Sequence, residues 1–150
     1  MSQSLASIKI HLIFSTKLRL PLLEADIRPD FYRYISAIAK RNGSEIFEIG
    51  GVEDHIHILL TLPKTTTLAK LVEVLKSSTS KWLKTKKESL NYFAWQTGYG
   101  AFSVSESQVP RVKKYIQEQQ KHHQKSGFKE ELIQFFRASK ISFDEKYLWT

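Results

Sequence analysis

The sequence predicts an α+β fold of the ferredoxin-like (RRM-like) class, an antiparallel sheet with helices on one face, plus a C-terminal helix. Segments with apolar residues at every second position alternate with segments whose apolar residues recur every three or four positions. Their order along the chain is strand, helix, strand, strand, helix, strand, which is the split β-α-β arrangement. With 150 residues and 41% hydrophobic content, residues 1–150 are expected to form one domain with its own core.

Local signals place each element. Strands are expected at 7–16, 44–49 and 55–62, with a fourth region, 92–95 and 101–104, interrupted by glycines. Helices are expected at 26–41, 67–84, 109–125 and 129–137. Asp26 and Thr67 are suitable N-caps, Pro110 suits a first helical turn, and Gly43 and Gly127 follow helix ends.

The composition excludes several classes of site and anchor. The chain has no cysteine, so disulfides and thiolate metal sites are excluded. No signal peptide is expected, because the first seven residues are polar and Lys9 and His11 break the apolar run that follows. No apolar stretch approaches the roughly 20 residues that span a bilayer.

Basic residues are concentrated in two segments of a chain whose net charge is +8. Residues 64–87 hold seven lysines and one acid, and residues 111–129 hold six basic residues and one acid. A balance of this kind favours polyanionic partners, because each neutralised phosphate releases counterions. Charge alone leaves open an ordinary solvated surface.

The most informative motif is His55-Ile56-His57 in the third expected strand. Strand side chains alternate between faces, so both imidazoles point away from the apolar residues around them and could bind one metal ion. In the predicted topology the first and third strands are neighbours, which places His11 on the same face. Two surface or hydrogen-bonded histidines are the alternative interpretation.

A second pair of residues lies on the helix expected at 109–125. Tyr115 and Gln119 are four residues apart and therefore share one helical face. Gln119 offers an amide oxygen as a third metal ligand, and Tyr115 offers a phenol beside it. A tyrosine on such a helix also commonly serves only for packing.

These residues belong to a set of motifs that resembles a known family, the single-tyrosine HUH transposases. This family comprises the insertion-sequence-two-hundred-like TnpA proteins and the repeat-associated tyrosine transposases. The resemblance extends over almost the whole chain, and its motifs are HLIFSTK at 11–17, DHIH at 54–57, LKSS at 75–78, WQTGYGAFSVS at 95–105, YIQEQ at 115–119, HH at 122–123 and FDEKYLW at 143–149.

The resemblance implies a function for the metal and tyrosine residues. His55 and His57 would bind Mg²⁺ or Mn²⁺ with Gln119 as third ligand, and Tyr115 would be the nucleophile. The protein would cut and rejoin single-stranded DNA with hairpin ends through a 5′-phosphotyrosine intermediate. It would act as a homodimer in which the tyrosine helix can serve the partner's site, in the cytoplasm of a bacterium or archaeon. Asp54 is expected to form a turn or to orient an imidazole.

Further residues are candidates for DNA contact: His11, Lys76, Lys81, Arg111, His122 and His123. Trp95, Tyr99 and Phe102 could stack on unpaired bases, although packing in a core is the more ordinary role. The alternative function is a non-catalytic ferredoxin-like nucleic-acid-binding module. A two-histidine phosphoesterase would need a second His-x-Ser/Thr motif, which the chain lacks.

Overall fold

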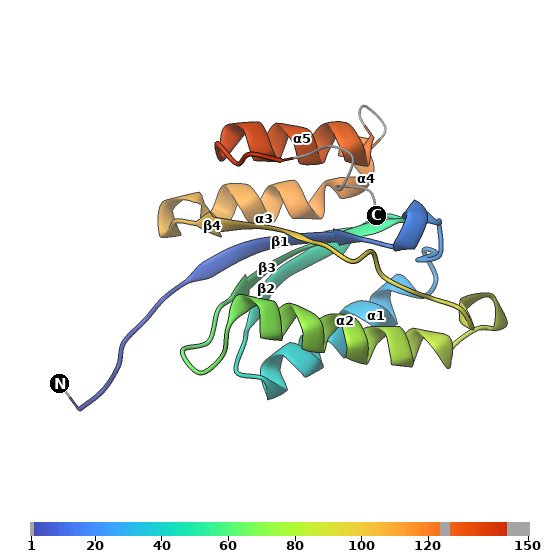
Figure 1. The fold of residues 1–150 in the computed structure, drawn as a ribbon, viewed down its shortest axis with the longest axis horizontal. Helices are drawn as coiled ribbons and strands as arrows, with labels where there is room; N and C mark the ends of the chain where they lie inside the picture. The colour runs from blue at the N-terminus through green and yellow to red at the C-terminus, as the bar shows by residue number, and fades with distance from the viewer. Residues whose placement is uncertain (1, 124–126, 144–150) are drawn as a thin grey trace.

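The computed structural model describes residues 2–123 and 127–143, except the side chains of Gln120 and His123. Its elements, shown in Figure 1, are β1 (Lys9–Ser15), η1 (Lys17–Arg19), α1 (Arg28–Arg41), β2 (Ile46–Gly51), β3 (His55–Thr61), α2 (Leu68–Lys84), η2 (Glu88–Leu90), β4 (Gly100–Val104), η3 (Glu106–Gln108), α3 (Val109–Gln117), α4 (Gln119–His123) and α5 (Phe128–Ala138). The motif predicted at 143–149 lies outside the described residues from position 144 onward.

The four strands form one antiparallel sheet in the order β2-β3-β1-β4. The two central strands are β1 and β3, as the topology predicted. In their register, Ile13 lies opposite His57 and Ser15 opposite His55. Ile13 and Ser15 therefore lie on the same face of the sheet as the histidine pair.

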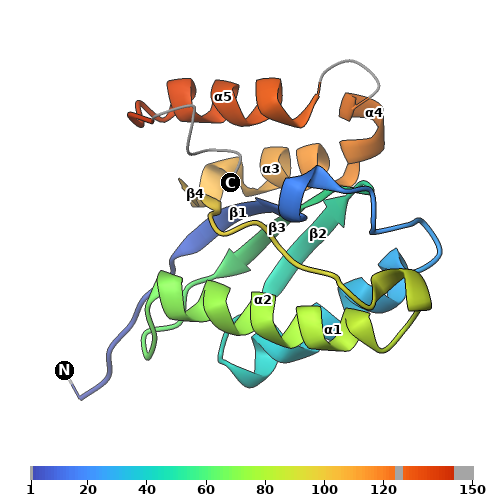
Figure 2. The same cartoon turned by 45° about the vertical axis from the view of Figure 1, so that its right-hand side comes forward.

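Helices α1 and α2 cover one face of the sheet (Figures 1 and 2). Thr67 caps α2, since its side chain accepts a hydrogen bond from the Lys70 backbone amide. The inward residues of β1 and β3 pack against the apolar stripes of both helices and form the main core. The fully buried members include Leu12, Phe14, Ile56, Ile58, Leu60, Phe31, Ile35 and Leu75.

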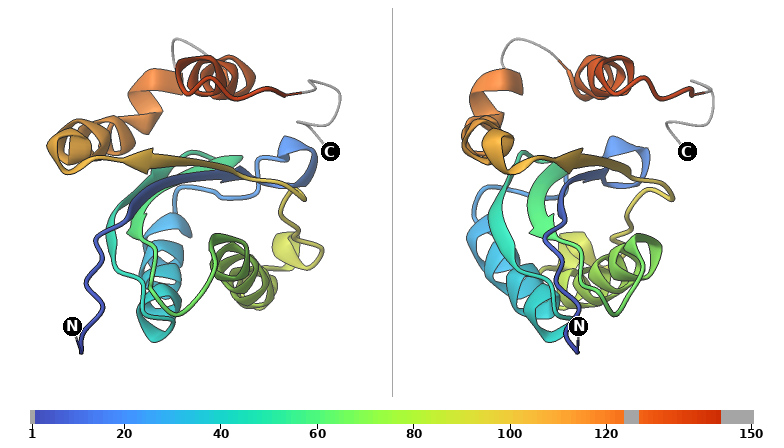
Figure 3. Two further views of the ribbon diagram at one scale, coloured as in Figure 1. Left: turned by 60° about the vertical axis from the view of Figure 1, so that its left-hand side comes forward. Right: turned by 90° about the vertical axis from the view of Figure 1, so that its left-hand side faces the viewer.

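The opposite face, which the sequence predicted to be open, is covered by the C-terminal helices (Figure 3). Helix α3 lies over β2 and β3. Helix α5 packs Phe128, Leu132 and Phe136 against Ile13 of β1 and Phe102 of β4. The expectation of an open face was wrong. Strands β1 and β4 carry the apolar side chains of Ile13 and Phe102 on this face, and burying them against α5 is favourable.

Two boundaries also differ from those expected. The helix predicted over 109–125 is divided at Glu118, whose φ of −97° and ψ of 23° interrupt the helical repeat between α3 and α4. Of the region predicted as a fourth strand, only Gly100–Val104 forms one; Trp95 makes an isolated bridge with Thr16. None of the helices in the described part of the chain has the length and hydropathy needed to cross a membrane.

Candidate metal centre and tyrosine site

The His55 and His57 side chains lie side by side in β3, and both are fully buried. Their ring centroids are 5.4 Å apart. The alternation of the strand places them on the face covered by α3 and α5, whereas Ile56 and Ile58 enter the main core. Both imidazoles therefore lie on one face of the strand, as the sequence predicted, but they are buried and not exposed to solvent.

A third group, Glu131 of α5, reaches both imidazoles. Its Oε1 atom lies 2.9 Å from His57 Nε2 and 3.6 Å from His55 Nε2. One potential ligand atom from each of the three residues lies within 4.8 Å of the others, and all three residues are buried. Two imidazole nitrogens and a carboxylate oxygen form a donor set that fits a divalent cation.

Sequence reasoning missed Glu131, although the sequence contained a signal. The residue lies between Phe128 and Leu132 on the apolar face of α5, where a charged side chain is out of place unless it has a buried partner. Periodicity alone did not indicate what that face would cover.

The other nitrogen of each imidazole has an orienting partner. His55 Nδ1 lies 2.7 Å from Asp54 Oδ1, and His57 Nδ1 lies 2.8 Å from His11 Nε2. Asp54 Oδ1 accepts a hydrogen bond from His55 Nδ1, which agrees with the orienting role expected of that residue. Both Nε2 atoms are thus directed at Glu131, the arrangement that outer partners impose on metal-binding histidines.

Burial and these contacts shift the proton affinities of the histidines. Burial and, to a smaller extent, the neighbouring His57 lower the pKa of His11 to about 3. Burial also acts to lower the pKa of His55, but hydrogen bonds with Asp54 and Glu131 outweigh it and raise that pKa. His11 is therefore uncharged, whereas the contacts with Asp54 and Glu131 favour the protonated form of His55.

Tyr115 brings a phenol to the same carboxylate. Its hydroxyl donates a hydrogen bond to Glu131 Oε2. Its ring centroid lies 5.7 Å from that of His57 and 4.4 Å from that of His122, on which it stacks. Burial, and then the contact with Glu131, raise the pKa of Tyr115 above its ordinary value, so the phenol is held in its protonated form.

Gln119 follows Tyr115 by one turn in spite of the break at Glu118. It is buried, and its Nε2 atom lies 3.4 Å from the Tyr115 carbonyl oxygen. The amide therefore lies near the tyrosine, as the spacing predicted. Its role as a metal ligand stays a prediction.

A glycine sets the distance between α3 and the sheet. Gly50 of β2 lies opposite His57 in the register. A Cβ atom on Gly50 would be only 2.4 Å from the backbone oxygen of Ile116, the neighbour of Tyr115. The absence of a side chain lets the backbone of α3 rest directly on the sheet beside the histidines.

Comparison with known proteins assigns the family. The sequence model described as "Transposase IS200 like" matches residues 4–119. The chain belongs to the IS200-like transposases. It is 25% identical over 117 residues to the ISDra2 transposase TnpA of Deinococcus radiodurans, covering 75% of this chain and 84% of that protein.

Two solved structures show the same fold. A crystal structure from Deinococcus radiodurans R1, of a protein assigned as a transposase, aligns with a TM-score of 0.61 and 23% identity, covering 77% of this chain and 93% of that one. A REP-associated tyrosine transposase bound to a REP hairpin aligns with a TM-score of 0.57 and 14% identity, covering 79% of this chain and 72% of that one. The family match ends at Gln119, so Glu131 lies in a segment beyond it.

In this IS200-like transposase, three of the residues predicted to contact DNA lie next to Tyr115: Arg111, His122 and His11. Arg111 is exposed and lines a cavity of about 290 Å³ together with Tyr115, His11 and Phe135. His122 stacks on the tyrosine ring. His11 is buried, with 2% exposure, and the side chain of His123 lies outside the described part. Contact of these residues with DNA stays a prediction.

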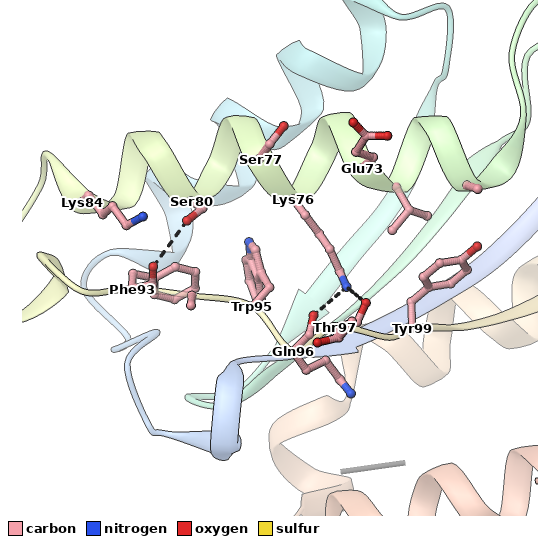
Figure 4. A pocket seen from close by; sticks show the side chains of 13 residues that line it. Glu73, Lys76, Ser77, Ser80, Lys84, Phe93, Trp95, Gln96, Thr97 and Tyr99 are labelled. Atoms are coloured by element: carbon pink, nitrogen blue, oxygen red, sulfur yellow. Dashed lines mark hydrogen bonds between the residues drawn. The ribbon is translucent and has the colours of Figure 1, made fainter. Parts of the chain in front are cut away.

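The two lysines predicted to contact DNA lie on α2, which covers the face of the sheet opposite the histidine pair. Lys81 is exposed on α2. The Lys76 amine donates hydrogen bonds to the carbonyls of Gln96 and Gly98, at 2.9 and 2.7 Å. It lies along one wall of a cavity of about 450 Å³, where Figure 4 shows the bond to Gln96. Burial lowers the pKa of Lys76 to about 8. Lys76 therefore supports the 96–98 loop.

The three aromatic residues have different surroundings. Trp95 donates a hydrogen bond from its indole nitrogen to Thr79 Oγ1 and packs edge-on against Phe14. Phe102 belongs to the cluster under α5. Tyr99, with 39% exposure, remains accessible beside the Figure 4 cavity. Packing thus accounts for Trp95 and Phe102.

Proposed function

We propose that this transposase cuts and rejoins single-stranded DNA through a 5′-phosphotyrosine at Tyr115, with a divalent metal ion at His55 and His57. One observation carries the proposal: the phenol and both imidazole Nε2 atoms meet at a single carboxylate, that of Glu131. This supports a candidate nucleophile and a candidate metal centre sharing one site within the same chain.

The chemistry requires little beyond these groups. The Tyr115 oxygen attacks the phosphorus, the bond from phosphorus to the 3′ oxygen breaks, and the leaving 3′ oxygen takes a proton from water to give a free 3′-hydroxyl. The phenol proton has an acceptor in Glu131, to which the hydroxyl already donates. The covalent link conserves the phosphodiester energy, so attack by a 3′-hydroxyl on the phosphotyrosine rejoins the strand and releases Tyr115 without a nucleotide cofactor.

His55 and His57 would hold the metal ion through their Nε2 atoms. When bound, Mg²⁺ or Mn²⁺ supplies positive charge to the phosphate oxygens during cleavage. For the third protein ligand, the geometry supports Glu131, whose carboxylate already faces both imidazoles. Gln119 remains the sequence-based alternative for that position.

Single-stranded DNA with hairpin ends is the proposed substrate. The net charge of +8 supports a polyanionic partner. A structural relative is itself bound to a REP hairpin. Tyr115 lies beside the histidines of its own chain, which supports cleavage by a tyrosine of the same subunit. A homodimer stays a prediction of the family resemblance.

The test is covalent capture of DNA. Single-stranded oligonucleotides tiled across both flanks of the gene are incubated with the protein and Mn²⁺, and adducts are resolved by denaturing electrophoresis. We expect an adduct with the wild-type protein and with Tyr92→Phe, which removes a hydroxyl from a 96% exposed tyrosine. Tyr115→Phe should form none while still binding DNA.

His57→Ala separates the metal site from the nucleophile. This variant should bind DNA but form no adduct, because it loses one of the two imidazole ligands. Capture by Tyr115→Phe would refute the nucleophile. DNA binding by the wild type that is indifferent to chelator and never yields an adduct would support the non-catalytic binding module instead.

A further inference from the structure

His11 occupies a buried position beside the metal centre. It lies on β1 with 2% exposure, and its Nε2 atom is 2.8 Å from His57 Nδ1. Its ring packs edge-on against Phe135, with centroids 5.2 Å apart, and against Tyr115 at 6.2 Å. Aromatic contacts thus fix the ring in place, and one of its nitrogens lies within hydrogen-bond distance of His57.

A metal-binding imidazole must present a lone pair on the nitrogen that faces the ion. For His55 and His57 that nitrogen is Nε2, since both Nε2 atoms face Glu131. A neutral imidazole with a lone pair on Nε2 carries its proton on Nδ1. For His55, the Asp54 carboxylate accepts a hydrogen bond from Nδ1 and so favours this tautomer.

We propose that His11 is the positioning residue of His57: when a metal ion is bound, the His11 Nε2 lone pair accepts a hydrogen bond from His57 Nδ1–H and so stabilises the His57 tautomer that binds metal. The inference rests on the proposed metal site and extends it to a residue outside the ligand set. His11 acts through His57 and not on the DNA, because its ring is enclosed by β1, Tyr115 and Phe135.

An imidazole in this position differs from the carboxylate beside His55. An ionised carboxylate only accepts hydrogen bonds, whereas a neutral imidazole has one N–H and one lone pair and can do either. His57 Nε2 lies 2.9 Å from Glu131 Oε1. In the proposed metal-free state, His11 Nε2–H donates to His57 Nδ1 while a proton on His57 Nε2 donates to the Glu131 carboxylate. With metal bound, the first of these bonds reverses and the second is replaced by coordination.

This reversal conserves protons. His57 gives up the proton on Nε2 and gains one on Nδ1, and His11 gives up the proton on Nε2 and gains one on Nδ1, so both rings stay neutral. His57 is therefore held in place whether or not an ion is bound.

Two substitutions distinguish hydrogen bonding from packing. His11→Phe keeps an aromatic ring between Phe135 and Tyr115 but removes both nitrogens. His11→Gln, the matched control, places an amide near the former Nε2 position and can still accept a hydrogen bond. Binding of Mn²⁺ to the DNA-free protein is measured by isothermal titration calorimetry, which does not depend on catalysis.

Loss of such an outer partner typically weakens metal binding about 10–100-fold, so we expect that loss in His11→Phe and a change within about threefold in His11→Gln. Equal affinity of His11→Phe and the wild type would overturn the inference and leave the metal site standing. Absence of Mn²⁺ binding in the wild type would overturn the metal site itself, and this inference with it.

A second measurement needs no variant at this position. In wild-type protein with ¹⁵N-labelled histidine, loaded with diamagnetic Mg²⁺ or Zn²⁺, the His57 nitrogens report their protonation by chemical shift. We expect a protonated Nδ1 and a metal-bound Nε2. An unprotonated Nδ1 in the loaded protein would contradict the proposal.

Discussion

Gly50 allows a direct test of how closely Tyr115 must approach the histidine pair. Alanine at this position would place its Cβ atom 2.4 Å from the Ile116 backbone oxygen and 3.2 Å from Ile116 Cγ2. Ordinary contact begins at 3.4 Å, so α3 must move away from the sheet by about 1 Å. The obstacle is backbone, and no side-chain rotation relieves it.

This displacement is transmitted to the phenol because Ile116 and Tyr115 are adjacent in α3. A misplacement of about 1 Å can lower the rate of a positioned reaction roughly 10²-fold, equivalent to about 2.7 kcal/mol in the barrier. His55 and His57 belong to β3 and keep their places. We therefore expect Gly50→Ala to bind Mn²⁺ nearly normally while forming the covalent adduct about 100 times more slowly.

The assay is the single-turnover rate of adduct formation, with calorimetric Mn²⁺ binding measured on the same preparation. Gly98→Ala is the matched control, since a Cβ atom there meets no heavy atom within 4 Å. It should cleave at the wild-type rate. A Gly50→Ala protein that cleaves within about twofold of wild type would refute the reasoning, because the rate would then not depend on how closely α3 is seated.

Three further predictions concern Glu131, Thr79 and Lys76. Glu131→Gln should weaken Mn²⁺ binding about tenfold or more in calorimetry, because an amide replaces the carboxylate facing both imidazoles, and unchanged affinity would exclude it as a ligand. Thr79→Val leaves the buried Trp95 indole N–H without its acceptor and should lower the free energy of unfolding by about 1–3 kcal/mol in urea titration, whereas Thr79→Ser should not. Because the pKa of Lys76 is lowered to about 8 from 10.5, the unfolded chain binds more protons between those values, and stability should rise with pH across that window. Lys76→Met should remove this rise when urea midpoints are compared, and a rise unchanged from wild type would show that Lys76 is not its source.

The order of the elements was readable from local pattern. Strand and helix periodicities are properties of neighbouring residues, so the alternation around His55 and His57 is sufficient to place both imidazoles on one face of their strand. The four-residue spacing of Tyr115 and Gln119 survived even where the helix itself is interrupted. The pairing of β1 with β3 followed from the topology.

Local sequence pattern could not predict which elements cover the face of the sheet that carries the histidine pair. The amphipathic pattern of α5 shows that Phe128 and Leu132 face an apolar surface, but not which surface. Glu131 meets His57 across 74 positions of sequence, a contact that no local pattern specifies. Lys76 lies in a lysine-rich segment and was predicted to contact DNA, and local sequence did not indicate that its amine donates hydrogen bonds to backbone carbonyls of a distant loop.

The sequence by itself therefore predicted candidate metal-binding and nucleophilic residues, and it determined on which face of its own element each of them lies. Only the tertiary structure decided that the Glu131 carboxylate of α5 contacts His57 and Tyr115, and that His11 lies within hydrogen-bond distance of His57. The physical reason is that side-chain direction follows from backbone periodicity within an element, whereas contacts between distant elements depend on how their apolar faces pack together.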